Sequence, residues 1–304
     1  RCAAAREEPH EGRGRVRSLT SLGLALVLIG AGQAEPPLIE VAKGGDWEAV
    51  RILLEQGADV GATAPDGATA LHWASYWDDL ESVALLIRAG ADVSAANDLG
   101  ATPLWLAAQN GSAAVVRELL EAQANPNAAL IDGETVLMRA ARAGDGDVVE
   151  QLLANGADPR RSATRGQTAL MWAANQQNDA VVEALLANGA DVHARSEVRR
   201  ELRRSETRQH THISNDFWVD EGGYTALLFA VRVGDLASAE LLLAAGADVD
   251  DQGASGVSAT VLAAHAGHAD IVELLLETGA DPNAAGAGYT ALHAAILRRN
   301  ETAV

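Results

Sequence analysis

Pairs of adjacent apolar residues recur along the chain, each followed by a second apolar pair four residues later. The clearest examples are Val115-Val116 with Leu119-Leu120, Val148-Val149 with Leu152-Leu153, Val181-Val182 with Leu185-Leu186, and Ile271-Val272 with Leu275-Leu276. Residues four apart lie on the same side of an α-helix, so each set forms one apolar stripe with polar residues around it. The pattern predicts short amphipathic helices that bury one side.

A three-residue signature follows these helices at a constant interval. Gly-Ala-Asp begins at residues 57, 90, 156, 189, 246 and 279, and Gln123-Ala124-Asn125 occupies the same place in the series. Successive copies begin 33 residues apart, except that 57 residues separate 189 from 246, which is 33 plus 24. A period of this size indicates stacked supersecondary units. We therefore expect one solenoid with an insertion, rather than two globular domains.

Residues 65–92 show what one unit contains. Asp66-Gly67 predicts a turn, and Thr69 stands at an N-cap position, where its hydroxyl can accept a backbone N–H. A short helix is expected over residues 70–77 and a second over 80–89, ended by Gly90 in the left-handed conformation. The same arrangement fits the units opened by Thr102, Thr135, Thr168, Thr225, Ser258 and Thr290. Two such helices cannot bury their stripes alone, so neighbouring units must stack.

The opening residues of the units resemble a known family. Thr69-Ala70-Leu71-His72 and Thr102-Pro103-Leu104, each followed by the Gly-Ala-Asp signature or its variant, are similar to the ankyrin repeat. The resemblance covers roughly residues 36–304, which is about eight repeats. It implies an all-α solenoid of antiparallel helix pairs with projecting hairpin-like turns, and a concave face that binds other proteins.

Histidine and tryptophan positions are interpreted as structural. The family's histidine is present only as His72 and His293, and its place in the repeat predicts a hydrogen bond to the preceding threonine rather than a catalytic role. Trp73 aligns with the apolar residues Leu106, Trp172 and Phe229, so its ring is expected to be buried between the layers. Trp47, in the cap-like first repeat at residues 36–59, is likewise expected in the core.

The resemblance places the last residues of each first helix at the concave groove. In the second repeat these are Tyr76 and Trp77, and aromatic rings exposed there would act as binding anchors. The alternative is that one ring only covers the cap repeat. The aligned positions of later repeats complete the candidate partner-binding set: Gln109, Asn110, Arg142, Asn175, Gln176, Arg232 and His265.

The insertion, at about residues 195–221, lengthens a projecting turn between two repeats. Its first half, residues 196–206, mixes arginine with glutamate and could form a charged helix. Three interpretations remain open for the whole segment. It could be a solvated loop without fixed structure, a second contact element beside the groove, or a metal site built from His210, His212 and Asp216.

Residues 1–34 differ from the repeats and predict a secretory signal peptide. Arginines at 13, 15 and 17 precede an apolar run over residues 19–29, and Gly32-Gln33-Ala34 suits cleavage after Ala34. An uncleaved membrane anchor is the alternative, but the run is short for a span. The expected location is therefore periplasmic or secreted, with residues 35–304 forming the mature ankyrin-repeat domain without a membrane segment.

The composition excludes some classes of binding partner and of metal site. A net charge of −19 and a pI near 4.7 argue against a nucleic-acid partner, which requires a basic surface. The chain has one cysteine, Cys2, so it offers neither a disulfide nor a cysteine-based metal site. His265 and His268 form an H-x-x-H pair without further ligands, so no metal or other cofactor is expected.

The leading hypothesis is a non-catalytic, monomeric scaffold that binds a protein partner of unknown identity. No nucleophile, base and oxyanion-site arrangement is visible in the sequence. The alternative is the binding module of a larger enzyme or receptor with its remaining part beyond residue 304. The unit opened by Thr290 is expected to break off at Val304, midway through its second helix, and the natural protein to continue.

Overall fold

The computed structural model describes residues 37–204 and 216–302, which form helix pairs and one pair of strands. The first helices of the units are α1 (Pro37–Lys43), α3 (Ala70–Tyr76), α5 (Pro103–Asn110), α7 (Val136–Ala143), α9 (Ala169–Asn175), α11 (Ala226–Val233), α13 (Ala259–Ala266) and α15 (Ala291–Thr302). The second helices are α2 (Trp47–Glu55), α4 (Leu80–Arg88), α6 (Ala113–Glu121), α8 (Gly146–Ala154), α10 (Asp179–Ala187), α12 (Leu236–Ala244) and α14 (Ala269–Glu277). The expected signal peptide at residues 1–34 lies outside the described residues.

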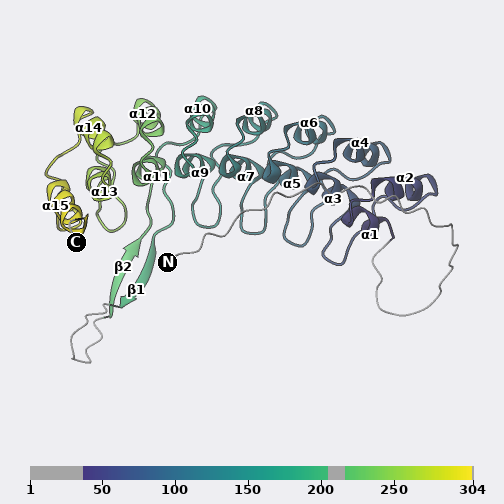
Figure 1. Cartoon of the computed structure of the whole chain (residues 1–304), viewed down its shortest axis with the longest axis horizontal. Coiled ribbons are helices and arrows are strands. Elements are labelled where there is room, and N and C mark those ends of the chain that lie inside the picture. The colour runs from purple at the N-terminus through teal and green to yellow at the C-terminus, as the bar shows by residue number, and fades with distance from the viewer. Residues whose placement is uncertain (1–36, 205–215, 303–304) are drawn as a thin grey trace, which may run out of the picture. The chain divides into compact units, whose positions relative to one another are not determined.

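The helices form two layers, one of first helices and one of second helices (Figure 1). Each first helix from α3 to α13 contacts the first helices of both neighbouring units and the second helix of its own unit. The apolar stripes lie between these contacts, and in α8 Val148, Val149, Leu152 and Leu153 are all buried. The predicted stack of antiparallel helix pairs is confirmed.

Polar caps define where the helices begin. The Oγ1 atom of Thr102 accepts the backbone N–H of Trp105 at 3.2 Å, and the hydroxyls of Thr135, Thr168 and Ser258 do the same for their own helices. In the second repeat, α3 and α4 end one residue before the predicted ends, and Gly90 follows α4 with φ +91°. Capping of this kind satisfies backbone groups that a short helix would otherwise leave without partners.

His72 replaces the simple threonine cap by a buried network. The backbone N–H of Thr69 donates to Nδ1 of His72 at 3.1 Å, the Thr69 hydroxyl lies 2.9 Å from the same nitrogen, and Nε2 lies 2.9 Å from the Ala101 carbonyl oxygen. These partners fit a neutral ring with its proton on Nε2, so that the ring links two repeats. His293 likewise contacts Thr290, at 2.8 Å from its hydroxyl. The predicted hydrogen bonds to the preceding threonines are confirmed.

The burial of His72 makes the stability of the protein depend on pH. Burial lowers the pKa of His72 below its ordinary value of 6.5, while the hydrogen bond to Ala101 and the charge of Asp66 act in the opposite direction. Below pH 6.5 the unfolded chain therefore takes up a proton that the folded chain refuses, so stability falls as the pH decreases. Urea unfolding at several pH values should show a weaker decrease for His72→Gln than for the wild type. Parallel curves for the two proteins would contradict this assignment.

The tryptophans are less buried than predicted. Trp73 and Trp47 are only partly buried and pack against the edge of the core. An indole ring is much larger than the alanines that separate the thin layers, such as Ala70 and Ala74, and part of the ring stays accessible. The prediction that both rings are buried in the core was therefore wrong, because they are only partly buried, although both contact the core.

The last described helix also departs from the prediction. α15 continues without interruption for 12 residues, so no second helix has begun by Thr302. In the preceding unit, Gly267 ends α13 with φ +79°, whereas Arg299 stands at the corresponding position of α15. Without a glycine to adopt the left-handed conformation there, the helix continues instead of turning.

The insertion forms a β-hairpin rather than the charged helix. Strand β1 (Arg199–Arg204) pairs antiparallel with β2 (Asp216–Glu221), and Arg200 stands opposite Asp220 in the register. Their charged groups lie 4.0 Å apart, and Arg199 stands opposite Glu221. Opposite charges facing each other across the two strands stabilise the ladder, an interaction that no helix of the first half alone could make. His210 and His212 lie outside the described residues.

The base of the hairpin is fixed to the repeats on both sides. Ser196 N donates to the carbonyl oxygen of Tyr224 at 3.0 Å, and Tyr224 N donates to Oγ of Ser196 at 3.0 Å. Arg195 donates to the carbonyl oxygens of Gly223 and Gln252 and pairs with the Asp251 carboxylate. The inserted strands therefore begin beyond a closed turn, and the helices on either side keep their normal lengths.

Deletion of residues 198–221 is expected to leave the fold almost unchanged. The deletion removes 24 residues, the length of the insertion, and retains Arg195, Ser196 and Tyr224 at the closed base. The free energy of unfolding, measured in urea, should therefore change by less than about 1 kcal/mol, because long surface insertions contribute little to stability. The control is Arg195→Ala, which removes the ion-pair partner of the buried Asp251 and should destabilise more than the deletion. The reverse order would show that β1 and β2 help to hold the stack together.

Candidate functional site

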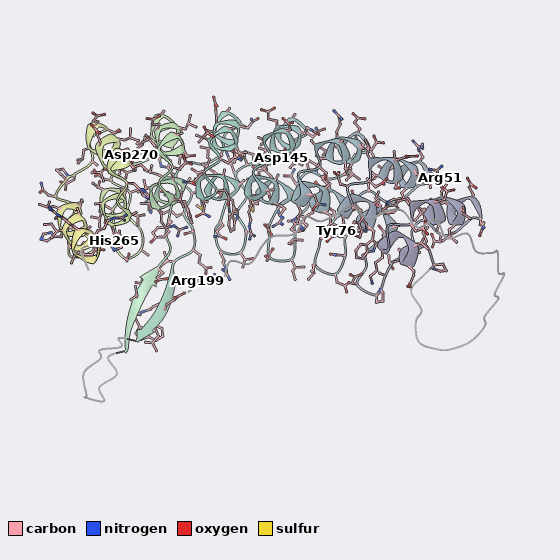
Figure 2. The ribbon with its side chains drawn as sticks, viewed as in Figure 1. Arg51, Tyr76, Asp145, Arg199, His265 and Asp270 are labelled. Atoms are coloured by element: carbon pink, nitrogen blue, oxygen red, sulfur yellow. The ribbon has the colours of Figure 1, made fainter. Side chains whose placement is uncertain are left out.

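The predicted binding residues lie in a row at the carboxyl ends of successive first helices. The row comprises Tyr76, Trp77, Gln109, Asn110, Arg142, Asn175, Gln176, Arg232 and His265. Gln109 and Asn175 are partly buried and the other seven are exposed. Figure 2 shows that Tyr76 and His265, near the two ends of the row, belong to the layer of first helices. The helices hold the row, but its members do not converge on a single point.

Side chains in this row join neighbouring repeats. Asn110 Nδ2 donates to the carbonyl oxygen of Tyr76 at 2.7 Å, and Arg232 donates to Oδ1 of Asn175 at 2.7 Å. Each bond joins adjacent repeats: Arg232 and Asn175 stand at equivalent repeat positions, and Asn110 lies one position beyond the counterpart of Tyr76. The row is therefore held in a defined arrangement before any partner arrives.

Tyr76 and Trp77 form the largest exposed aromatic surface of the row. Their exposed fractions are 44% and 51%, and their ring centroids lie 5.5 Å apart in an edge-to-face arrangement. Trp73 continues the cluster, with its ring centroid 6.0 Å from that of Tyr76. Edge-to-face packing fixes the rings relative to one another and leaves their outer surfaces available for contact.

A second feature, which the sequence interpretation missed, is a series of cations lying over aromatic rings. Arg139 lies 5.1 Å from the ring centre of Trp105, and Arg142 lies 4.7 Å from that of Trp172. Arg232 lies 4.9 Å from the ring centre of Phe229. Such contacts contribute roughly 0.5–1 kcal/mol at exposed sites and align the guanidinium planes with the rings. The available signal was the presence of arginines and aromatic residues in the first helices of neighbouring repeats.

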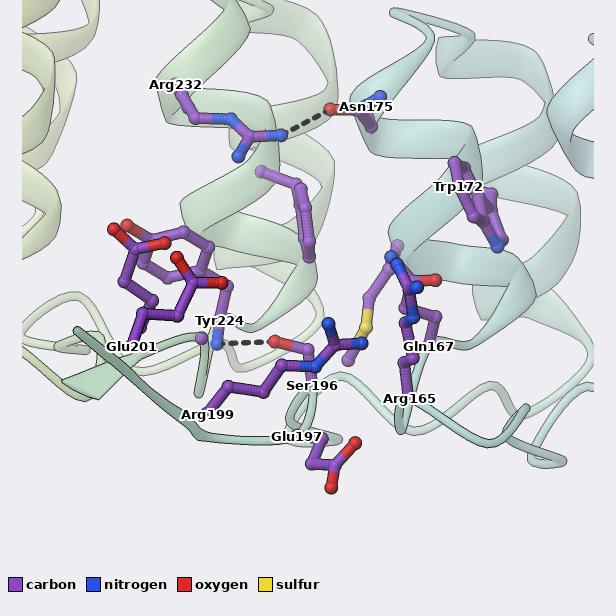
Figure 3. Close-up of a pocket in the computed structure, with 14 residues that line it drawn as sticks. Arg165, Gln167, Trp172, Asn175, Ser196, Glu197, Arg199, Glu201, Tyr224 and Arg232 are labelled. Atoms are coloured by element: carbon purple, nitrogen blue, oxygen red, sulfur yellow. Dashed lines mark hydrogen bonds between the residues drawn. The ribbon is translucent and has the colours of Figure 1, made fainter. Parts of the chain in front are cut away.

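Two cavities lie between the projecting turns, one on each side of the turn at residues 163–167. The first has a volume of about 420 Å³ and is bounded by Asn175, Arg232 and the base of the hairpin. The second, of about 670 Å³, is bounded by Glu134 and Arg142. Both are lined by Arg165, Gln167, Trp172, Glu197 and Arg199, all of which are labelled in Figure 3. The cavities therefore adjoin.

Of the predicted row, only Arg142, Asn175 and Arg232 line these cavities. Arg165 and Arg199 were not predicted, because the first belongs to a turn and the second to a strand in a segment for which a charged helix was one possibility. Only the fold brings these two arginines to one cavity.

Glu134 is an acidic residue of the site whose surroundings change its pKa. Burial raises the pKa of its carboxyl above the ordinary value of 4.5, against the opposing charges of Arg139 and Arg142. Its Oε1 atom is buried, has no hydrogen-bond partner in the described part of the chain, and lies 3.9 Å from the Arg142 guanidinium. A buried carboxylate oxygen without a donor is costly, so a bound N–H group or water would stabilise it.

The described residues contain no group of three or more histidine, cysteine, aspartate or glutamate side chains that could hold a metal ion. His265 is exposed at the end of α13, and His268 precedes α14. Over residues 37–204 and 216–302, no helix is long and apolar enough to cross a membrane.

Comparison with known proteins identifies the repeats. A family model described as ankyrin repeats in three copies matches residues 21–98, 38–129, 79–163, 104–196 and 227–304. The gap between these matches, 197–226, contains both strands of the hairpin. The crystal structure of the human ASB11 ankyrin repeat domain is similar, with 28% identity and a TM-score of 0.64, and the match covers 81% of this chain and 99% of that one. No curated protein sequence matches the chain.

Proposed function

The chain belongs to the ankyrin-repeat family, and we propose that it is a protein-binding module whose partner contacts the ends of the first helices and the projecting turns. The observation that carries this proposal is the exposed pair Tyr76 and Trp77, at 44% and 51% exposure, within a row of polar residues. Large aromatic rings that stay exposed in the free protein are typical anchors of protein interfaces. Ankyrin-repeat proteins are typically non-catalytic scaffolds, and the proposed role requires no catalytic group.

The arrangement of the row supports tight binding at low conformational cost. Asn110 and Arg232 are already held by bonds to neighbouring repeats, and Arg142 lies over the ring of Trp172. Side chains that are ordered before binding lose little entropy when a partner arrives. The resemblance to the family also supports a concave binding face on this side, with the adjoining cavities receiving side chains of the partner.

Charge restricts the class of partner. With a net charge of −19, the protein repels polyanions at long range, so we propose a protein partner rather than a nucleic acid. We also propose that the chain is exported to the periplasm or medium, based on the arginines and apolar run before residue 34. Sequencing the N-terminus of secreted protein would test export, and a chain that remains inside the cell with residues 1–34 attached would contradict it.

The proposal is tested by affinity capture with residues 35–304 as bait, followed by mass spectrometry and titration of each purified candidate. A genuine partner should bind the wild type directly. A second, differently tagged copy of the wild type should compete with the bait for that partner. Capture must also depend on the row of residues described above. Replacing Tyr76 and Trp77 by alanine tests this dependence. If no protein binds the wild type directly, the proposed function fails.

A further inference from the structure

Strand β1 has one edge that pairs with no other described strand, and this edge is called its free edge below. Among the described residues β1 and β2 form a two-stranded sheet, so each strand pairs only with the other. At the base, Glu197 N donates to the carbonyl oxygen of Arg165 at 2.8 Å, and Ala254 N donates to that of Gly222 at 2.9 Å. The free edge of β1 therefore lies on the side of the turn that contains Arg165. Figure 1 shows the hairpin extending beyond the neighbouring turns, which leaves this edge without a neighbouring strand.

The two strands carry opposite charge. β1 contains four arginines and one glutamate, whereas β2 contains three acidic residues and no basic one. The basic strand stands out in a chain whose net charge is −19. An unpaired strand edge is a template for a further strand, and its charges select what can pair there. The edge of β1 favours an acidic segment and disfavours a basic one.

The cavity at the base of β1 is lined by two arginines that make no ion pair within the described part of the chain. Arg165 and Arg199 both line the two adjoining cavities, and neither guanidinium makes a hydrogen bond or ion pair with another described side chain. In Figure 3 the two side chains point toward the same part of the cavity. Two cations held near one another repel, and a carboxylate placed between them would relieve the repulsion and accept their hydrogen bonds. Trp172 forms an adjacent wall of the same space.

Acidic side chains limit what can bind here. Glu197, Glu201 and Glu221 line the first cavity, and in Figure 3 Glu201 lies beside Tyr224 rather than beside Arg165. A densely charged polyanion would meet these carboxylates. In an extended segment only every second side chain faces the same way, so alternating acidic and neutral residues can place carboxylates on the arginines alone.

We propose that an acidic extended segment of the protein partner pairs with the free edge of β1 and places carboxylates on Arg165 and Arg199. The proposal rests on the proposed protein-binding function and adds the chemistry and conformation of the bound segment. The hairpin is then the element that distinguishes the partners of this protein from those of repeats without an insertion.

The test uses a fluorescein-labelled peptide of alternating glutamate and threonine, titrated by fluorescence anisotropy with residues 35–304. Arg165→Ala combined with Arg199→Ala should weaken binding at least about tenfold, because two charge-assisted contacts are lost. The control Arg117→Ala removes an exposed arginine from the layer of second helices and should leave binding unchanged. Among the described residues neither cavity arginine has a side-chain partner to lose, so circular dichroism should show an intact fold.

Two further probes examine the bound form. A peptide with N-methyl groups on alternate residues should bind more weakly, since strand pairing requires its backbone N–H groups. A lysine–threonine peptide should show no sensitivity to the two arginine changes. The inference is overturned if the glutamate peptide does not bind at millimolar concentration or binds the double variant as tightly as the wild type. Equal binding of the N-methylated peptide, or displacement by inorganic phosphate beyond that by chloride at equal ionic strength, overturns it as well.

The acidic-segment inference and the proposed protein-binding function can fail independently of each other. If a captured partner binds the wild type and the double arginine variant equally, the protein-binding function stands and the acidic-segment inference fails. If no partner binds the wild type, the proposed function fails, and the peptide titration still reports whether β1 selects acidic segments.

Discussion

Replacing Leu170 by alanine is expected to lower the free energy of unfolding by about 2–5 kcal/mol. Leu170 is 1% exposed and belongs to α9, which packs against α7, α10 and α11. Removal of its side chain leaves a cavity at the junction of three units, and the helices cannot all close around it. Since each repeat is stabilised mainly by its neighbours, a defect in a central unit weakens the coupling on both sides.

Urea unfolding followed by circular dichroism measures this effect. The matched control is Leu99→Ala, because Leu99 lies in a projecting turn and is 60% exposed. Its truncation should change the free energy of unfolding by less than about 0.5 kcal/mol. A shallower transition for Leu170→Ala would also be informative, since it would show that the stack no longer unfolds as one unit. Equal stability of the two variants would contradict the assigned core.

Loss of Tyr76 and Trp77 is expected to have the largest effect on partner binding. Each ring is about half exposed, so the double change to alanine should cost less stability than the loss of fully buried rings of the same size. Asn110 bonds to the main-chain carbonyl of residue 76, so that link between repeats survives the change. A hot-spot aromatic contributes about 2 kcal/mol or more, so the loss of even one such anchor predicts at least roughly a thirtyfold weaker affinity.

Trp73→Ala is the matched control for this experiment. Its ring contacts Tyr76 and packs against the core, with the Lys43 ammonium 5.8 Å from the ring centre. The variant should lower stability more than the double change does, and should reduce binding of a captured partner less. If Tyr76 and Trp77 turn out to be required for folding while Trp73 is not, the two sides of α3 have been assigned in reverse and the proposed binding surface is lost.

The candidate site was only partly predictable. Repeat alignment correctly placed Tyr76, Trp77 and their counterparts at the ends of the first helices, because a 33-residue period returns each position to the same place. It could not find Arg165 or Arg199, which come from a turn and from a strand and share a cavity only after folding. It also could not show that Arg142 lies over the ring of Trp172, since that contact depends on the spacing between units.

The sequence by itself determined the repeating architecture. Apolar stripes such as Val148 to Leu153, threonine caps and left-handed glycines are all local signals, and each specifies a helix, its beginning or its end within a few residues. Because most units repeat these signals, a single interpretation extends along the whole stack. Stacking follows, since no unit can bury its own stripe.

The tertiary structure decided the features that depend on partners distant in sequence. Residues 199–204 form a strand because residues 216–221 return with opposite charges, and neither segment specifies this alone. Trp73 stays partly exposed because the space between the layers is set by the alanines around it, not by its own hydrophobicity. Local patterns therefore determined where helices lie, whereas pairing across the insertion and the spacing between repeats determined the surface available to a partner.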